Sequence, residues 1–151
     1  ITGLLFMMVG LVYDRTHTRQ IPELVGGLAK RMPVIAIVFT IAGLASLGLP
    51  ALSGFVAELL VFIGTYERSP LMAILGASGI VLTAGYILWM IERVFFGDFN
   101  PKWSDLGDAV ALEKVTVFTT VVVIVAVGIA PAIVMNIVNT AIPTIMSRLG
   151  Y

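Results

Sequence analysis

The sequence predicts an all-α membrane protein, a polytopic transmembrane helix bundle. Hydrophobic residues make up 59% of the 151 residues and charged residues only 12%, about half the charged share of an average soluble domain. The mean hydropathy is +1.05. The charges are also separated by uncharged runs longer than the roughly 18 residues that suffice to propose a membrane span. We expect one membrane domain over residues 1–151, with about four full passes and one truncated pass.

The charge balance and the residue types exclude several classes of function. Nine basic residues balance nine acidic ones, so no excess charge favours nucleic acid as a partner. The sequence has no cysteine, which excludes Fe–S clusters and thiolate zinc sites from this chain. Asp98, Asp105 and Asp108 lack the ligand spacing of a calcium loop, and we expect them to form a solvated face. We therefore expect no cofactor and no metal in this chain.

The longest apolar segment predicts a broken helix. Glu58 alone interrupts 35 residues without a charge, from Met32 to Tyr66, and one straight helix of that length would reach about 52 Å. Its middle, Gly48-Leu49-Pro50-Ala51-Leu52-Ser53-Gly54, places a proline between glycines and should stop or break a helix. We expect two passes here, over residues 33–48 and 53–67.

The other uncharged runs predict three further passes. Residues 1–13 would rise only about 20 Å as a helix, against a hydrocarbon core of about 30 Å. We interpret them as a truncated pass, which makes the chain a fragment. Residues 70–92 fit one full pass. Residues 115–140 fit one long pass, kinked because Pro131 and Pro143 interrupt the last uncharged run.

Glu58 is the main candidate for a functional residue, because it is a carboxyl group inside an otherwise apolar pass. A charge at the centre of a membrane costs about 2.5–3.5 kcal/mol on insertion scales, and such residues usually face a bundle interior or a water-filled cavity. Burial disfavours the ionised form, so this group could bind and release a proton. Two alternatives remain. Glu58 could be protonated and hydrogen-bonded between helices, or it could lie at headgroup level if its pass begins near Gly54.

Charged residues at the ends of the predicted passes form a weaker set of candidates. His17 is the single histidine, and it could relay protons at the membrane surface or stabilise its loop by a hydrogen bond. Glu92 could line a proton exit or, with Arg93, anchor its helix at the interface. Lys30 and Arg31 have the pattern of a charged collar at the start of a helix.

Five segments of the sequence together resemble a known family. They occur in order between residues 13 and 97, and they are Tyr13–Arg19, Gly26–Pro33, Ala45–Pro50, Ser53–Glu58, and Gly85-Tyr86 followed by Arg93–Gly97. They resemble the antiporter-like membrane subunits of NADH:quinone oxidoreductase (complex I), and among these the M chains most closely. From residue 98 onward only the hydrophobic pattern agrees.

The resemblance implies roles for the candidate residues. The chain would be the C-terminal third of a subunit built from two inverted repeats, each with a broken helix that carries an essential charge. Glu58 matches the acid of the second broken helix in the M chains, where the sister subunits usually have lysine. His17 matches a loop histidine of the family, and Lys30, Arg31 and Arg93 match basic positions at helix ends.

The function that the resemblance implies is proton translocation driven by electron transfer from NADH to quinone. This subunit of the translocase would perform no redox chemistry. NADH, FMN, Fe–S clusters and quinone would be bound by partner subunits, and the other complex I membrane subunits and the lipid bilayer would surround it, in the bacterial inner (plasma) membrane. The alternatives are the D-type subunit of a multisubunit Na⁺/H⁺ antiporter, a subunit of a membrane-bound hydrogenase, and a purely structural anchor for an enzyme arm.

The orientation in the membrane stays open. With alternating passes, the basic residues of loop 14–31 fall on the side opposite to those of loop 92–114. The larger number of Lys and Arg then favours the first side as cytoplasmic, whereas helix counting in the resembled family favours the reverse.

Overall fold

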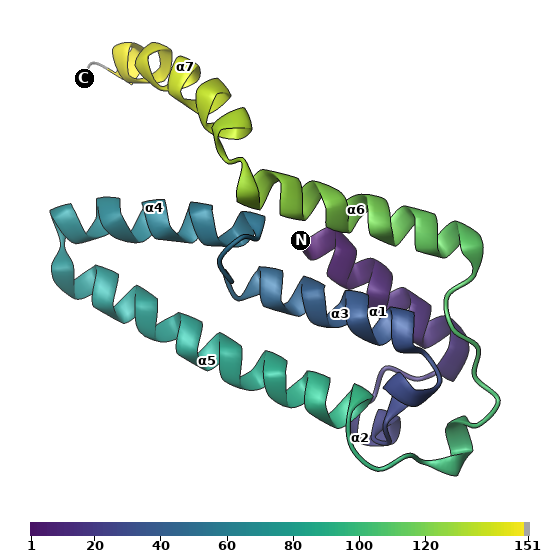
Figure 1. The fold of residues 1–151 in the computed structure, drawn as a ribbon. Helices are drawn as coiled ribbons and strands as arrows, with labels where there is room; N and C mark the ends of the chain where they lie inside the picture. The colour runs from purple at the N-terminus through teal and green to yellow at the C-terminus, as the bar shows by residue number, and fades with distance from the viewer. Residues whose placement is uncertain (150–151) are drawn as a thin grey trace.

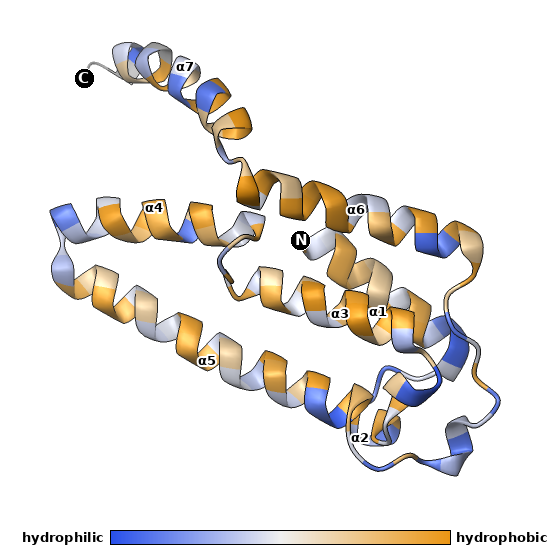
Figure 2. Cartoon of the chain, viewed as in Figure 1, coloured by the Kyte–Doolittle hydropathy of each residue, from blue (hydrophilic) through white to orange (hydrophobic). Residues whose placement is uncertain are grey.

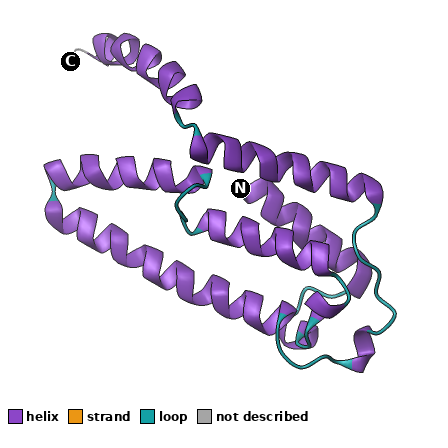
Figure 3. Cartoon of the chain, viewed as in Figure 1, coloured by secondary structure: helices purple, strands orange, loops and turns teal. Residues whose placement is uncertain are grey.

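The computed structural model describes residues 1–149, and within them helices are joined by loops without any strand (Figure 1, Figure 3). The helices are α1 (Thr2–Thr16), α2 (Ile21–Leu24), η1 (Leu28–Lys30), α3 (Pro33–Ser46), α4 (Ser53–Arg68), α5 (Pro70–Phe95), η2 (Pro101–Trp103), α6 (Ala111–Ile129) and α7 (Ala132–Leu149). The prediction of an all-α bundle is confirmed. Its core lies where α1, α3, α6 and the C-terminal half of α5 meet.

Two helices, α5 and α6, are long and apolar enough to cross a membrane by themselves. Only 11% and 17% of their most apolar stretches are buried, so most of this apolar surface points away from the bundle. Figure 2 shows apolar colour along the sides of the helices, while hydrophilic residues gather at the loops. Apolar faces of this extent are typical of helices that contact lipid or other membrane helices.

The two halves of the longest apolar segment lie end to end. α3 and α4 run in the same direction, and α5 returns antiparallel beside both of them (Figure 1). At 1.5 Å per residue, α3 rises about 21 Å and α4 about 24 Å, so each is shorter than the hydrocarbon core of about 30 Å. The arrangement therefore favours one broken crossing over the two separate passes that we expected over residues 33–48 and 53–67.

The last apolar segment is also divided. We expected one kinked pass over residues 115–140, but α6 ends at Ile129 and α7 begins at Ala132 and turns away from the bundle (Figure 1). Pro131 lies between them and disfavours a helical conformation of the residue before it, and Ala130 has φ −120° and ψ 64°. Pro143, in contrast, is accommodated inside α7.

The loops at 14–31 and 92–114 pack together at one end of the bundle, which we call the loop end. The Asn100 N–H donates to the Gly26 carbonyl at 3.2 Å. The Asp108 carboxylate accepts from the Val34 and Ile35 N–H groups, at 3.0 and 3.3 Å. Asp108 thus caps α3, and the solvated role that we expected for it is wrong. The assignment of these loops to opposite sides of the membrane is also wrong, because it counted α3 and α4 as two crossings.

Arg15 connects α1 to α6 and to the loop between α5 and α6. Its guanidinium donates to the Gly107 and Asp108 carbonyls, at 2.9 and 3.1 Å, and forms an ion pair with Glu113 at 2.5 Å. The Glu113 carboxylate also accepts from the Val110 N–H at 2.8 Å, at the first turn of α6. These bonds fix the conformation of the loop end, where α3 begins.

Candidate functional site

The break between α3 and α4 is a hydrogen-bonded turn. Gly48 has φ +66°, the left-handed conformation that commonly ends helices. The Leu49 N–H donates to the Leu44 carbonyl at 3.2 Å and the Gly48 N–H to the Ala45 carbonyl at 3.3 Å, which is the bonding pattern of a Schellman motif. Ala51 follows with φ 73°. The break thus lies within the segment that the sequence predicted, and its conformation is defined by its own backbone bonds.

Glu58 lies in the second turn of α4, and its side chain folds back onto this turn. A Cβ placed on Gly48 would overlap Glu58 Oε2 and would lie 2.8 Å from Cδ, so the carboxyl group occupies the space that a side chain at position 48 would need. Glu58 is half-buried. Among residues 1–149, Arg15–Glu113 is the one ion pair, so no Lys or Arg in this part of the chain balances a Glu58 carboxylate.

Glycines allow three backbones to meet around the break. A Cβ on Gly54, in the first turn of α4, would overlap the carbonyl oxygen of Ala45. A Cβ on Gly128, near the end of α6, would overlap the Ala51 carbonyl oxygen and lie 2.5 Å from the carbonyl carbon of Leu52. The ends of α3 and α6 therefore pack closely against the start of α4. Sequence reasoning missed Gly128, and a glycine within an apolar helical run was its one signal.

The weaker candidates lie elsewhere, at the loop end. Lys30 and Arg31 are exposed and are separated from the break by the whole of α3, about 21 Å. Glu92 is exposed, and the Arg93 guanidinium lies 4.6 Å from the centre of the Trp89 ring. The structure does not bring these four residues to Glu58, and their functional roles remain predictions.

His17 has a local structural role. It ends α1 with φ 56°, and its N–H donates to the Tyr13 carbonyl at 2.7 Å. Its exposed ring stands edge-on to the Tyr13 ring, with centroids 6.4 Å apart. This agrees with the alternative in which His17 stabilises its loop, although its contribution here comes from the backbone N–H. A proton relay at this position remains a prediction.

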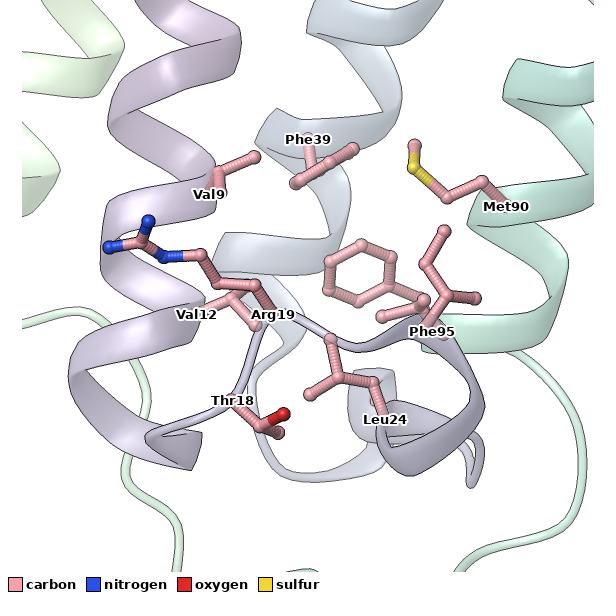
Figure 4. Close-up of a pocket in the computed structure, with 10 residues that line it drawn as sticks. Val9, Val12, Thr18, Arg19, Leu24, Phe39, Met90 and Phe95 are labelled. Carbon is pink, nitrogen blue, oxygen red and sulfur yellow. The ribbon is translucent and has the colours of Figure 1, made fainter.

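A small apolar cavity of about 160 Å³ lies between α1, α2, α3 and α5 (Figure 4). Phe39, Phe95 and Leu24 form its walls together with Met90, and the stem of Arg19 passes along one side. Binding and catalytic pockets combine apolar walls with a few converging polar groups. No carboxyl group lines this cavity, so it is distinct from the Glu58 site.

The class of protein follows from the fold and the break together. Membrane transport proteins often build their ion and proton sites at a discontinuous helix. Within a polytopic helix bundle, that helix presents an ionisable side chain. The family model described as "NADH:quinone oxidoreductase/Mrp antiporter, TM" matches residues 1–106. The chain belongs to this family, and the resemblance drawn from the five sequence segments is confirmed.

Individual relatives agree with this assignment. The chain is 36% identical over 143 residues to NADH-quinone oxidoreductase subunit M of Rhodobacter capsulatus, covering 94% of this chain and 28% of the relative. It is 35% identical over 153 residues to F(420)H(2) dehydrogenase subunit M of Methanosarcina mazei, covering 99% of this chain and 31% of the relative. A chain of respiratory complex I from Thermus thermophilus with bound NADH is similar in fold, with a TM-score of 0.77 and 31% identity, over 82% of this chain and 26% of that chain. The chain thus spans less than a third of the length of each of these proteins.

Proposed function

We propose that this chain is part of a proton-translocating membrane subunit of a respiratory NADH:quinone oxidoreductase, and that Glu58 carries the proton. The observation that supports this most directly is the position of the Glu58 carboxyl group, which folds back onto the helix break. The relatives with M-subunit names agree with this proposal.

The chemistry of a carboxyl group at a helix break suits this task. An ionised carboxylate only accepts hydrogen bonds, whereas the protonated group also donates one, so proton binding changes the partners that Glu58 can hold. A broken helix leaves backbone carbonyl and N–H groups without helical partners, and these can hydrogen-bond water or an ionisable side chain inside a membrane. Glu58 can therefore exchange a proton with water at the break.

Electron transfer belongs to partner subunits in this proposal. The two relatives named above carry different donors in their names, NADH and F(420)H(2), yet resemble this chain to nearly the same degree. This supports a role that is independent of the donor. NADH, FMN, Fe–S clusters and quinone would then be bound by partner subunits. We place the assembly in the bacterial inner (plasma) membrane, among the other complex I membrane subunits.

A sodium-driven function is the second candidate, because the family description also includes the Mrp antiporter. The D-type subunit of such an antiporter, or the related subunit of a membrane-bound hydrogenase, would use the same acid with a different energy source.

Membrane vesicles containing the complete assembly distinguish these functions. Proton uptake that starts on addition of NADH supports the oxidoreductase, and uptake that starts only with a sodium gradient supports the antiporter.

Substitution of Glu58 by Gln tests the proton carrier. We expect Glu58→Gln to lower NADH-driven proton uptake by about tenfold or more, since a positioned proton-transfer group commonly contributes 10²-fold or more to a rate. Assembly of the complex, followed on native gels, should stay normal. Glu67→Gln is the matched control, because Glu67 is an exposed residue at the far end of the same helix. Normal proton uptake in an assembled Glu58→Gln complex would leave the structural-anchor alternative as the better account.

A further inference from the structure

The contact between Gly48 and Glu58 joins a residue without a side chain to the end of an acidic side chain ten positions later. We infer that Gly48 is a positioning residue for Glu58: the missing side chain at position 48 provides the space that holds the carboxyl group at the break. This inference rests on the proposed function, because it concerns the same acid. It assigns Gly48 a second task beyond ending α3.

The geometry shows how tightly this space is filled. A Cβ on Gly48 would lie 2.8 Å from Glu58 Cδ and 3.3 Å from Oε1 and would overlap Oε2, whereas carbon atoms in contact are about 3.5–4.0 Å apart. Any side chain at position 48 would therefore displace the carboxyl group by about 1 Å. The displaced atoms form the free end of a flexible side chain, so the chain can still fold while the acid loses its position.

The position of residue 48 is itself fixed by the backbone. The two hydrogen bonds that end α3, from Gly48 to Ala45 and from Leu49 to Leu44, hold its φ at +66°. The start of α4 is held nearby, because Gly54 packs against the Ala45 carbonyl. The break and the second turn of α4 therefore keep a fixed relation, and the side chain of Glu58 spans the short space between them.

Two substitutions at position 48 separate this role from the simple ending of a helix. Asn tolerates the left-handed conformation that residue 48 adopts, while Ala disfavours it. Both residues carry a Cβ. If Gly48 serves only to end α3, Gly48→Asn should behave like the unsubstituted protein and Gly48→Ala should not. If Gly48 holds space for the acid, both variants should be impaired.

The position of Glu58 is measured by its rate of modification with the apolar reagent dicyclohexylcarbodiimide, followed by mass spectrometry of the α4 peptide in the assembled complex. Proton uptake with NADH is measured on the same vesicles. A displacement of about 1 Å can change the rate at a positioned group by as much as 100-fold, so we expect Gly48→Ala and Gly48→Asn to change both rates by about tenfold or more. Gly64→Ala in the same helix is the matched control, since a Cβ there meets nothing within 4 Å.

Shortening the acid tests whether Gly48 and Glu58 act through the same contact. Glu58→Asp withdraws the carboxyl group by about one carbon–carbon bond, about 1.5 Å, which is enough to clear a Cβ at position 48. Glu58→Asp alone should lower both rates, but adding Gly48→Ala to it should lower them little further, whereas two independent effects would multiply. If Gly48→Ala prevents assembly, recovery of assembly in the double variant supports the inference, and continued failure overturns it.

The two readouts separate the inference from the proposed function. Unchanged labelling of Glu58 in both Gly48 variants would overturn the positioning role, whatever happens to proton uptake. Altered labelling with normal proton uptake would confirm the positioning role and would refute Glu58 as the proton carrier.

Discussion

Gly128 lies near the end of α6, where this helix meets the break between α3 and α4. Replacing it by Ala would place a Cβ 2.5 Å from the carbonyl carbon of Leu52 and 2.6 Å from that of Ala51, so α6 would have to withdraw by about 1 Å to reach ordinary contact. Overpacking of this kind costs about 1–3 kcal/mol. We expect the upper part of that range, because backbone atoms cannot rotate away. Ala regains about 1 kcal/mol over Gly inside a helix, which leaves a net destabilisation of about 1–2 kcal/mol.

The measurement is the free energy of unfolding of the full-length subunit in mixed micelles titrated with dodecyl sulfate, followed by far-UV circular dichroism. Gly64→Ala in α4 is the control, because a Cβ at position 64 meets nothing within 4 Å and only the gain in helix propensity of about 1 kcal/mol remains. The two variants should therefore differ by about 2–3 kcal/mol and in sign. Equal stabilities for the two variants would show that α6 does not pack closely against the break.

Two further predictions concern the loop end. Arg15→Ala removes the ion pair with Glu113 and two bonds to loop carbonyls. Since hydrogen bonds to charged groups contribute about 1.5–3 kcal/mol, we expect the same titration to show a loss of about 2–3 kcal/mol, and a loss below about 0.5 kcal/mol would contradict this role. Asp108→Ala removes the cap of α3 and should cost about 1 kcal/mol. It should also speed hydrogen exchange at the Val34 and Ile35 amides by about fivefold, in line with that loss. Unchanged exchange at these amides would show that Asp108 does not cap α3.

Much of the fold follows from local signals in the sequence. The long uncharged runs locate α5 and the start of the last apolar segment, and Pro70 at the first position of α5 agrees with the preference of proline for the first helical turn. The break was located because Gly48 and Pro50 each end a helix by their own backbone chemistry. Glu58 was identified because a single acid in an apolar run is costly wherever the rest of the bundle lies.

The arrangement of the pieces depended on contacts that local signals do not contain. Pro131 separates two helices while Pro143 is accommodated within one, although both interrupt apolar runs. In the sequence Asp108 looks like any other acidic residue of a loop, because nothing there shows that it lies beside the first turn of α3. The space for Glu58 at Gly48 joins positions ten residues apart, and the sequence does not show that α4 folds back far enough for this contact. Each of these contacts depends on how the helices pack against one another, so it could be identified only from the structure.

The helices beside the break between α3 and α4 cover part of its backbone. Unpaired backbone groups within a membrane are stable only where protein or water surrounds them. α5 runs past both α3 and α4, and Gly128 of α6 covers Ala51 and Leu52 directly. The break is thus covered in part, by α5 along one side and by the end of α6 at Ala51 and Leu52, whereas Leu49, Pro50 and Ala51 keep exposed surface that water or a partner subunit must cover. The length of α3 places the break about 21 Å from the loop end. A charged group at such a depth in a membrane is costly, and α3 carries no Lys or Arg that could offset a negative charge on Glu58. Binding a proton removes the charge of Glu58 and changes the hydrogen bonds that its carboxyl group can make. The protonation state of Glu58 and the position of its carboxyl group beside Gly48 should therefore be coupled.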